Sequence, residues 1–303
     1  MHLLITGGTV FFSRFAAEYF IRAGHAVTVL NRGSRPQPEG AEALLCDRRQ
    51  PGDILRGRHF DAVLDITAYE PADIGGLLSS GVTFDDYVMI SSSAVYPETN
   101  PQPFTEEQTC GRNAYWGDYG TNKLAAERLL REQVPRAYIL RPPYLYGLYE
   151  NLYRAAFVFD CAVQNRPFWL PGDGSLPLQF FHVRDACRLT EILLRQHPDE
   201  RLLNVGNPAP VSVREWVTLC YLAVGTEPVF RQAPTDVPLW KYFCFRDYAY
   251  RLDVTRQARW LTDLTPMEQG LREQWEWYRL HTDGISNRKP FLEFIDTHFR
   301  GSC

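Results

Sequence analysis

The chain has 303 residues, of which 45% are hydrophobic and 22% charged, and its formal net charge is −4. This length allows one large domain or two moderate ones with a substantial core. The weakly acidic balance excludes a general basic field for nucleic acid, and no apolar run reaches the roughly 18 residues of a membrane span. No basic segment followed by an apolar one opens the chain, so we expect a cytoplasmic protein.

In the first half of the sequence, short apolar runs alternate with helical patterns. The runs expected to form strands are 2–6, 26–30, 43–46, 61–66, 86–91 and 137–140. The helical patterns cover 13–23, 51–55, 71–79 and 119–133. This alternation predicts an α/β fold, in which a doubly wound parallel sheet of the Rossmann type carries helices on both faces.

The alternation stops after about residue 147, where Pro and aromatic residues become frequent. Helices are expected over 152–164, 184–195, 213–223 and 267–279, and a strand near 201–206 is expected to return to the main sheet. We therefore expect a dinucleotide-binding Rossmann domain over 1–147 plus this strand. Most of 148–303 is expected to form a smaller, mixed α/β substrate lobe. The stretch 97–117 lacks periodicity and is long for an idle loop, which suggests a lid or substrate loop.

The opening MHLLITGGTVFFSRFAAEYF suggests a cofactor turn, although the usual G-x-x-G-x-x-G pattern is broken by Val10 and Ser13. Gly7 and Gly8 still supply the turn, and Ser13 is small enough for close packing and carries a hydroxyl for a phosphate. The following helix N-terminus attracts phosphates. A plain strand–turn–helix remains an alternative for this motif alone. The residues expected to bind cofactor here are Gly7, Gly8, Thr9, Val10, Phe11, Phe12 and Ser13.

The second strand ends in Asn31-Arg32, where an NAD site usually carries an acidic residue for the ribose. Replacing a carboxylate and adding a guanidinium favours a 2′-phosphate. The cofactor is therefore expected to be NADP or NAD, with NADP slightly favoured, although Arg32 also fits a solvated loop position. Asp47, after the third strand, is expected to reach the adenine. The seven cysteines form no C-x-x-C pair and are expected to be reduced thiols, and no cluster suggests a metal.

Two further motifs predict a catalytic centre. ISSSAVY, at 90–96, ends a strand, and YGTNK, at 119–123, opens a helix. Tyr119 and Lys123 lie one helical turn apart and are expected to point toward the carboxyl edge of the sheet. A free Tyr has a pKa near 10, and we expect Lys123 and an oxidised nicotinamide to lower it. Tyr119 would then exchange a proton with a substrate hydroxyl, while a strand-end Ser bonds the same oxygen.

With these motifs the chain resembles the extended short-chain dehydrogenase/reductase family, in its nucleotide-sugar epimerase/dehydratase branch. Further matching pieces are LRPPYLYG at 140–147, FFHVRDACR at 180–188 and LLNVGN at 202–207. The resemblance implies that Ser92 is the catalytic hydroxyl and that Tyr119 and Lys123 are the catalytic pair. The altered turn and the NRG ending resemble an atypical bacterial subgroup of that family.

The remaining site residues follow from this resemblance. Tyr69 and Pro142 are expected to contact the cofactor. The expected substrate contacts are Ser93, Tyr96, Tyr144, Gln179 and Arg246.

Two departures restrict the function that the resemblance implies. Ser93 and Ala94 replace the Asp-Glu pair that follows the catalytic hydroxyl in sugar 4,6-dehydratases, which argues against dehydration. Leu178 stands where sugar epimerases place a phosphate-binding Arg, with Arg246 and Lys241 as the nearby basic candidates. The sequence therefore leaves open whether the substrate carries a nucleotide.

These observations predict an NAD(P)-dependent epimerase or reductase, acting on a secondary alcohol or ketone of a sugar or nucleotide sugar. The alternative is a non-catalytic, RNA-associated or regulatory member of the same fold, because some relatives of the atypical subgroup associate with RNA. The expected partner is a small-molecule substrate, with no nucleic acid and no membrane. A homodimer is allowed by the sequence but not required by it.

Overall fold

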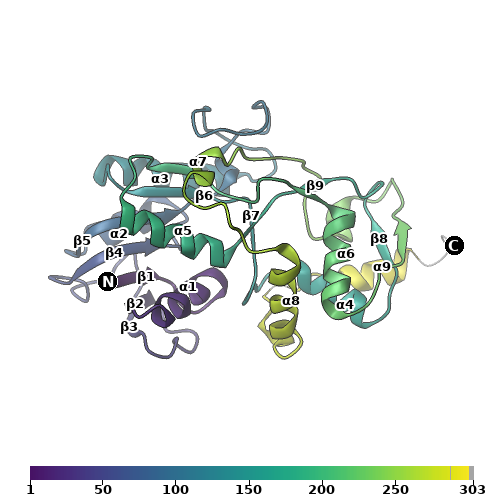
Figure 1. Cartoon of the computed structure of the whole chain (residues 1–303), viewed down its shortest axis with the longest axis horizontal. Helices are drawn as coiled ribbons and strands as arrows, with labels where there is room; N and C mark the ends of the chain where they lie inside the picture. The colour runs from purple at the N-terminus through teal and green to yellow at the C-terminus, as the bar shows by residue number, and fades with distance from the viewer. Residues whose placement is uncertain (287, 300–303) are drawn as a thin grey trace. The chain divides into compact units, whose positions relative to one another are not determined.

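The apolar runs of the first half assemble into one seven-stranded sheet with the order β11-β6-β5-β4-β1-β2-β3 (Figure 1). All six pairings are parallel. The strands are β1 His2–Thr6, β2 Ala26–Asn31, β3 Glu42–Leu45, β4 His59–Asp65, β5 Thr83–Ile90, β6 Tyr138–Arg141 and β11 Leu202–Asn204. This is the predicted doubly wound sheet, and the late strand β11 returns to it by pairing with β6.

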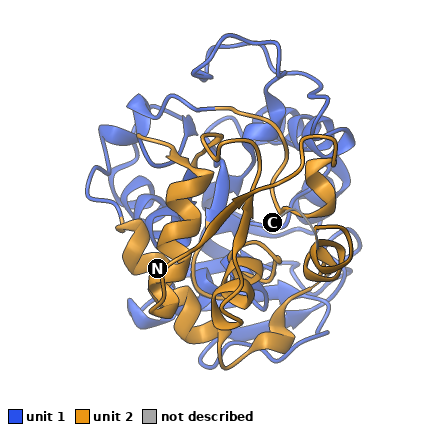
Figure 2. Cartoon of the chain, turned by 90° about the vertical axis from the view of Figure 1, so that its right-hand side faces the viewer, with its two compact units in different colours: residues 1–145, 180–208, 251–264 blue, residues 146–179, 209–250, 265–303 orange. Residues whose placement is uncertain are grey.

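The computed structural model describes residues 1–286 and 288–299. It divides into two compact units (Figure 2). Unit 1 contains Met1–Leu145, Phe180–Pro208 and Arg251–Leu264, and unit 2 contains the intervening segments and the C-terminal part. Unit 1 thus takes two later segments of the chain in addition to its N-terminal half, and the second of them, Arg251–Leu264, had no counterpart in the sequence-based division.

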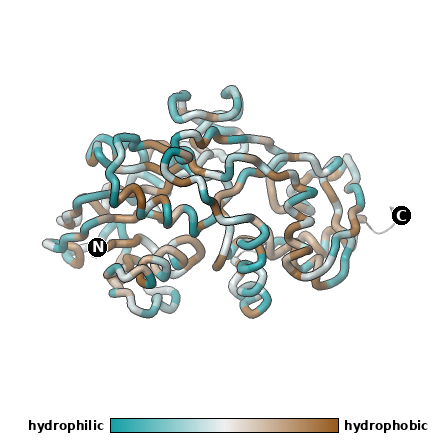
Figure 3. The backbone as a smooth tube through the Cα atoms, in the orientation of Figure 1, coloured by the Kyte–Doolittle hydropathy of each residue, from teal (hydrophilic) through white to brown (hydrophobic). Residues whose placement is uncertain are grey.

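Helices cover both faces of the sheet in unit 1. They are α1 Phe11–Arg22, α2 Pro71–Leu78, α3 Asp118–Gln133, α5 Val183–Gln196 and the short α7 Thr255–Ala258. Successive strand residues point to opposite faces. One face packs against α2 and α3, whose residues Ile74 and Leu130 share a buried cluster with Leu4. On the other face α1 packs against β1, β2 and α5. Figure 3 shows how hydrophobic residues follow the strands of this sheet.

One expected helix of unit 1 is absent. Residues 51–55 form turns, although Leu55 is completely buried. The prediction of a helix there was wrong because the stretch is too short to repay helix nucleation and contains Pro51 and Gly52. The apolar Leu55 belongs to the core without needing a helix to carry it.

The stretch 97–117, expected to be a lid or substrate loop, is anchored within unit 1. Phe104 is completely buried, its N–H donates to the Arg251 carbonyl at 2.8 Å, and its carbonyl accepts from the Asp253 N–H at 2.8 Å. The Glu106 carboxylate accepts from the Asn204 N–H at 2.7 Å. These bonds join the loop to β11 and to the segment at 251–264, which does not fit a freely opening lid.

Unit 2 is a helical lobe with short strand pairs. Its helices are α4 Ala155–Val163, α6 Val213–Val224, α8 Met267–Tyr278 and α9 Phe291–His298. Strand β9, Pro177–Leu178, pairs antiparallel with β12, Val211–Ser212, and β8, Phe168–Leu170, pairs parallel with β13, Phe230–Gln232. Aromatic side chains fill its interior, with Phe157 in contact with Phe168 and Phe291. Within the described residues, no helix is both long and apolar enough to cross a membrane.

Candidate functional site

The glycine pair after β1 is required by its surroundings. Gly7 and Gly8 have φ angles of 92° and 89°, a region that favours glycine. A Cβ on Gly8 would lie 2.4 Å from Val29 Cγ1, and one on Gly7 would lie 2.8 Å from Ser13 Oγ. The turn therefore keeps the geometry of a cofactor loop at both positions where the sequence keeps glycine.

Helix α1 begins at this turn with an N-terminus suited to an anion. Val10, its N-cap residue, makes no side-chain capping bond, and the first turn contains no acidic residue. The free N–H groups of its first turn and the positive end of its dipole therefore face the space in front of the N-terminus, where they can bind an anion. The Ser13 hydroxyl, which was expected to be offered to a phosphate, instead donates to the Val10 carbonyl at 2.8 Å. Its role in the structure is to close the first turn.

A cavity of about 470 Å³ lies against this turn in unit 1. It brings together many residues predicted for the cofactor, namely Gly7, Thr9, Val10, Ser13, Asn31, Arg32, Asp47 and Tyr69. Phe12 is instead buried in the core, and the buried Pro142 accepts the Ser93 N–H on its carbonyl at 2.9 Å. The turn, the helix N-terminus and the cavity together fit a dinucleotide.

Asn31 and Arg32 differ in what they contact. The Asn31 side-chain amide donates to the Gly7 carbonyl at 2.7 Å and to Gln37 at 2.8 Å, so Asn31 ties the end of β2 to the turn. Arg32 is exposed at the cavity. Its side chain makes no hydrogen bond or ion pair with residues 1–286 or 288–299, so its guanidinium is available to an anion there.

The sequence reasoning missed a second arginine at the cavity. Arg48 forms a bidentate pair with the fully buried Asp65, with both N–O distances at 2.6 Å, and donates to the Thr67 hydroxyl at 3.1 Å. Burial alone would raise the pKa of Asp65, but the Arg48 guanidinium holds it below its ordinary value. No local motif announces this pair, because it joins the loop after β3 to the end of β4.

The structure brings Ser92 and Tyr119 together at the carboxyl edge of the sheet. Ser92 caps the short helix η1, Ser93–Val95, by accepting the Ala94 N–H at 3.1 Å. Tyr119 is the second residue of α3, and Ser92 is close enough to its hydroxyl to lower its pKa. Gly120 makes this approach possible, since a Cβ there would lie 2.2 Å from the Ala94 carbonyl oxygen.

Lys123 lies one turn further along α3 and is 2% exposed. Its ammonium group donates to the carbonyls of Ala68, at 2.7 Å, and Ile90, at 2.9 Å. The ring of Tyr69 covers it, with Nζ 4.8 Å from the ring centroid, and the Tyr69 and Tyr119 rings lie 6.5 Å apart. The predicted pair therefore shares a helix face, while the charge of Lys123 is held by two strand-end carbonyls.

The pKa values of the two groups move in opposite directions. Although Tyr119 is 41% exposed, the surroundings of its hydroxyl exclude enough water to raise its pKa to about 12, against the lowering effect of the Ser92 hydrogen bond. Burial lowers the pKa of Lys123 to about 8, against the attraction of Asp65 and Glu127. The expectation that Lys123 lowers the pKa of Tyr119 is not met by the protein's own groups, because Lys123 faces the carbonyls.

The residues expected to contact substrate are scattered. Tyr96 is completely buried, its hydroxyl donates to Asn204 at 2.7 Å and accepts from Arg141, and Gln179 is 1% exposed. Both side chains belong to the interior. The sequence did not reveal this, because a position in a motif does not show whether a side chain faces the site or the core. Ser93 and Tyr144 are also buried, with Tyr144 against Trp116, and Arg246 is exposed in unit 2.

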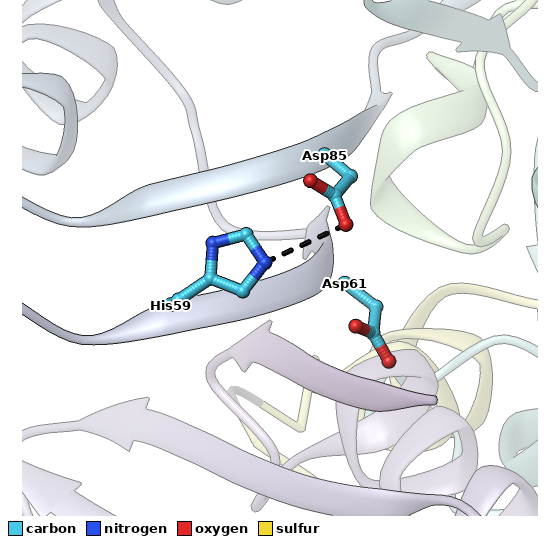
Figure 4. Close-up of side chains that lie close together, drawn as sticks. All are labelled: His59, Asp61 and Asp85. Carbon is cyan, nitrogen blue, oxygen red and sulfur yellow. Dashed lines mark ion pairs between the residues drawn. The ribbon is translucent and has the colours of Figure 1, made fainter.

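One cluster of His and carboxylate side chains lies away from this site. His59, Asp61 and Asp85 gather on β4 and β5 (Figure 4). His59 Nε2 lies 3.5 Å from the Asp85 carboxylate, and Asp61 accepts the His2 N–H at 2.6 Å. They lie toward the amino ends of the strands, opposite the edge that carries Ser92, and we assign them no function.

Replacing the buried Lys123 should change how stability depends on pH. Because its folded pKa is about 8 and its ordinary value is 10.5, the unfolded chain binds a proton that the folded chain lacks between these values. Wild-type stability should therefore rise through this window, by up to roughly 1.4 kcal/mol per pH unit. In urea unfolding at about pH 7.5 and 9.5, Lys123→Met should lack this gain. The exposed Lys289→Met is the control, and equal pH dependence in all three proteins would contradict the assignment.

The comparisons with known proteins agree with this fold. A family model of the NAD dependent epimerase/dehydratase family matches residues 77–206. The chain is 26% identical over 278 residues to the chloroplast stem-loop binding protein of 41 kDa b of Arabidopsis thaliana, covering 84% of the chain and 72% of that protein. It is 26% identical over 239 residues to the 2'-dehydrokanamycin reductase of Streptomyces kanamyceticus, covering 74% and 67%.

Solved structures share the fold at low identity. A UDP-glucose 4-epimerase superposes with a TM-score of 0.76 at 20% identity, over 95% of this chain and 100% of that one. MoeE5 in complex with UDP-glucuronic acid and NAD superposes with a TM-score of 0.71 at 22% identity, over 92% and 99%. The family model matches the segment that contains Ser92, Tyr119 and Lys123, so this part of the chain is similar to the NAD dependent epimerase/dehydratase family.

Proposed function

We propose that the chain is an NAD(P)-dependent epimerase or reductase acting on a secondary alcohol or ketone of a sugar. The observation that carries this proposal is the approach of α3 to the turn of Ser92 at Gly120, which brings Tyr119 next to Ser92 at the carboxyl edge of the sheet, one helical turn from Lys123. The names of the Streptomyces reductase and of the epimerase structure support the same class of reaction.

The residues of unit 1 divide the work in this proposal. The turn at Gly7 and the N-terminus of α1 hold the pyrophosphate, and Asp47 and Arg32 hold the adenosine end. When bound, the cofactor supplies or accepts the hydride. Ser92 and Tyr119 bond the reacting oxygen of the sugar, and Tyr119 exchanges a proton with it.

In this proposal Tyr119 is the group that exchanges a proton with the reacting oxygen, in either direction of the reaction. With a pKa of about 12, its hydroxyl is protonated at neutral pH and can donate to a carbonyl oxygen. Denaturing release of the nucleotide from purified protein distinguishes the two reactions. Retained oxidised cofactor indicates an epimerase, which must return the hydride to the same substrate, and an empty protein that binds NADPH indicates a reductase.

Binding of a structured RNA is the second candidate, because the Arabidopsis relative, which aligns with 84% of the chain, is named for stem-loop binding. The net charge of −4 and the placement of Tyr119 next to Ser92 favour the enzyme. A gel-shift titration with a stem-loop RNA tests this candidate. Salt-sensitive binding by a protein without turnover on any keto sugar would favour it.

Arg32 should give the site a preference for NADP(H) over NAD(H). One charge-assisted contact with the 2′-phosphate is worth about 1.5–3 kcal/mol, roughly tenfold to a hundredfold in affinity. Titrations of both cofactors followed by Trp fluorescence measure the ratio. Arg32→Ala should narrow it, whereas Arg35→Ala, which changes an exposed Arg in the same loop, should not. Tighter binding of NAD(H) to the wild type would reject the proposal.

Removing the Tyr119 hydroxyl should abolish turnover and leave cofactor affinity nearly unchanged. General acid–base groups contribute about 10²–10⁴-fold, and Tyr119→Phe removes only that group. A panel of keto sugars is first screened with the wild type. Turnover of those that it reduces is then followed by the absorbance of reduced nicotinamide. Tyr115→Phe, at a tyrosine that is 38% exposed and four residues earlier, is the matched control. A Tyr119→Phe variant that kept about a tenth of the activity or more would remove Tyr119 from this role.

The substrate is proposed to lack a nucleotide diphosphate. Leu178, at the position where epimerases place an Arg, is 1% exposed within the β9–β12 pair of unit 2. A buried diphosphate needs charged partners, and the basic candidates in unit 2 are Arg246 and Lys241. Calorimetry with UDP, TDP, GDP and CDP should show binding weaker than micromolar. Micromolar binding that is lost in Arg246→Ala would restore a nucleotide-sugar substrate, and micromolar binding unchanged in Arg246→Ala and Lys241→Ala would place the site elsewhere.

A further inference from the structure

Helix α3 carries a further side chain, Glu127, on the face that holds Tyr119 and the buried Lys123. Glu127 follows Lys123 by four residues and is 1% exposed. Its Oε1 accepts from Arg141 Nε at 3.0 Å and from the Ser91 hydroxyl, and its Oε2 accepts from an Arg141 terminal nitrogen at 2.5 Å. Both carboxylate oxygens are therefore bound, and the contact with Arg141 is bidentate.

The partners of Glu127 stand at the ends of two sheet strands. Arg141 is the last residue of β6 and is 2% exposed. Its remaining terminal nitrogen donates to the Tyr96 hydroxyl at 2.9 Å, and its guanidinium lies 5.0 Å from the centroid of the Tyr96 ring. Ser91 directly follows β5 and directly precedes Ser92. The Glu127–Arg141 pair thus joins α3 to the strand ends from which Ser92 projects.

Two specific contacts therefore locate α3 along this edge. Near its start, Gly120 lies against the Ala94 carbonyl, and two turns later Glu127 binds Arg141 and Ser91. Apolar packing alone tolerates sliding and rotation of a helix, whereas a bidentate carboxylate–guanidinium contact is directional. Lys123 lies between these two contacts on the helix, and Tyr119 directly precedes the first. The positions of both residues relative to Ser92 therefore depend on the two contacts.

We propose that the Glu127–Arg141 pair is a positioning device for the catalytic centre, which sets the placement of Tyr119 on Ser92 and of Lys123 on its carbonyls. The expected effect on turnover rests on the proposed function. The expected displacement of Tyr119 does not. A contact needed only for folding could be replaced by apolar side chains, since such replacement of buried ion pairs is often neutral or stabilising. Reactive geometry is less tolerant, because a misplacement of about 1 Å can cost 10²-fold in rate.

The test replaces both partners at once, as Glu127→Leu with Arg141→Met, so that no buried charge is left unpaired. We expect urea unfolding close to wild type, a fall in kcat of at least about tenfold, and KM and cofactor affinity within about threefold. The exposed Glu132→Gln, on the same helix, is the matched control. A folded double variant with wild-type kcat would overturn the proposal.

A second readout does not depend on turnover. The NMR signal of the hydroxyl-bearing carbon of Tyr119, assigned by its loss in Tyr119→Phe, reports the surroundings of this hydroxyl beside Ser92. It should shift in the double variant and stay in place in Glu132→Gln, even if no substrate is found and the proposed function fails. If the double variant does not fold, Arg141→Lys, which keeps the charge and loses the fork, and Ser91→Ala take its place. An unmoved Tyr119 signal in folded variants would overturn the proposal.

Discussion

No side chain fits between helix α3 and the carbonyl of Ala94, and the arrangement of the proposed catalytic residues depends on this restriction. Because Gly120 has no Cβ, the helix begins in contact with the turn that carries Ser92. Tyr119, its neighbour in the chain, then reaches Ser92, and Lys123 falls one turn lower onto the carbonyls of Ala68 and Ile90. A larger residue at this position would move the helix as a rigid body, and each of these contacts would change together.

The charged side chains buried at the strand ends of unit 1 differ in the partners that they have. Asp65, at the end of β4, is buried but remains ionised because Arg48 binds both of its oxygens. Arg141 binds both carboxylate oxygens of Glu127 in the same way. With both carboxylates already paired, Lys123 has no ion-pair partner of its own among the described residues and is held by neutral carbonyls, which is why burial lowers its pKa.

Much of unit 1 was predictable because its signals are local. Apolar runs bounded by glycine identified the strands, and the spacing of Tyr119 and Lys123 identified a shared helix face without knowledge of the fold. The prediction of a helix at 51–55 was wrong, because the apolar Leu55 indicates burial in the core and not a helix. The resemblance assigned Tyr96, the last residue of ISSSAVY, and Gln179, which precedes FFHVRDACR, to the substrate, yet both side chains are buried in the interior.

The unpredicted parts of the site are contacts between segments far apart in the sequence. Arg48 with Asp65 and Glu127 with Arg141 each join a loop or helix to a strand end, and no spacing rule relates their positions. The carbonyl partners of Lys123 belong to the backbone, where residue identity carries no information. The anchoring of the loop at 97–117 likewise depends on residues around 251, which the sequence pattern assigned to the other lobe.

The order in which unit 1 is assembled differs from the order in which it is synthesised. Its sheet is complete at β6 only when β11 pairs with it, and Phe104 finds the backbone of Arg251 and Asp253 more than a hundred residues later. A chain emerging from the ribosome therefore holds β6 as an open sheet edge until about residue 204 has been made, and the backbone of Phe104 waits longer still for its partners at Arg251 and Asp253. During this interval the nascent chain presents an unpaired sheet edge, which is a place where another chain can pair.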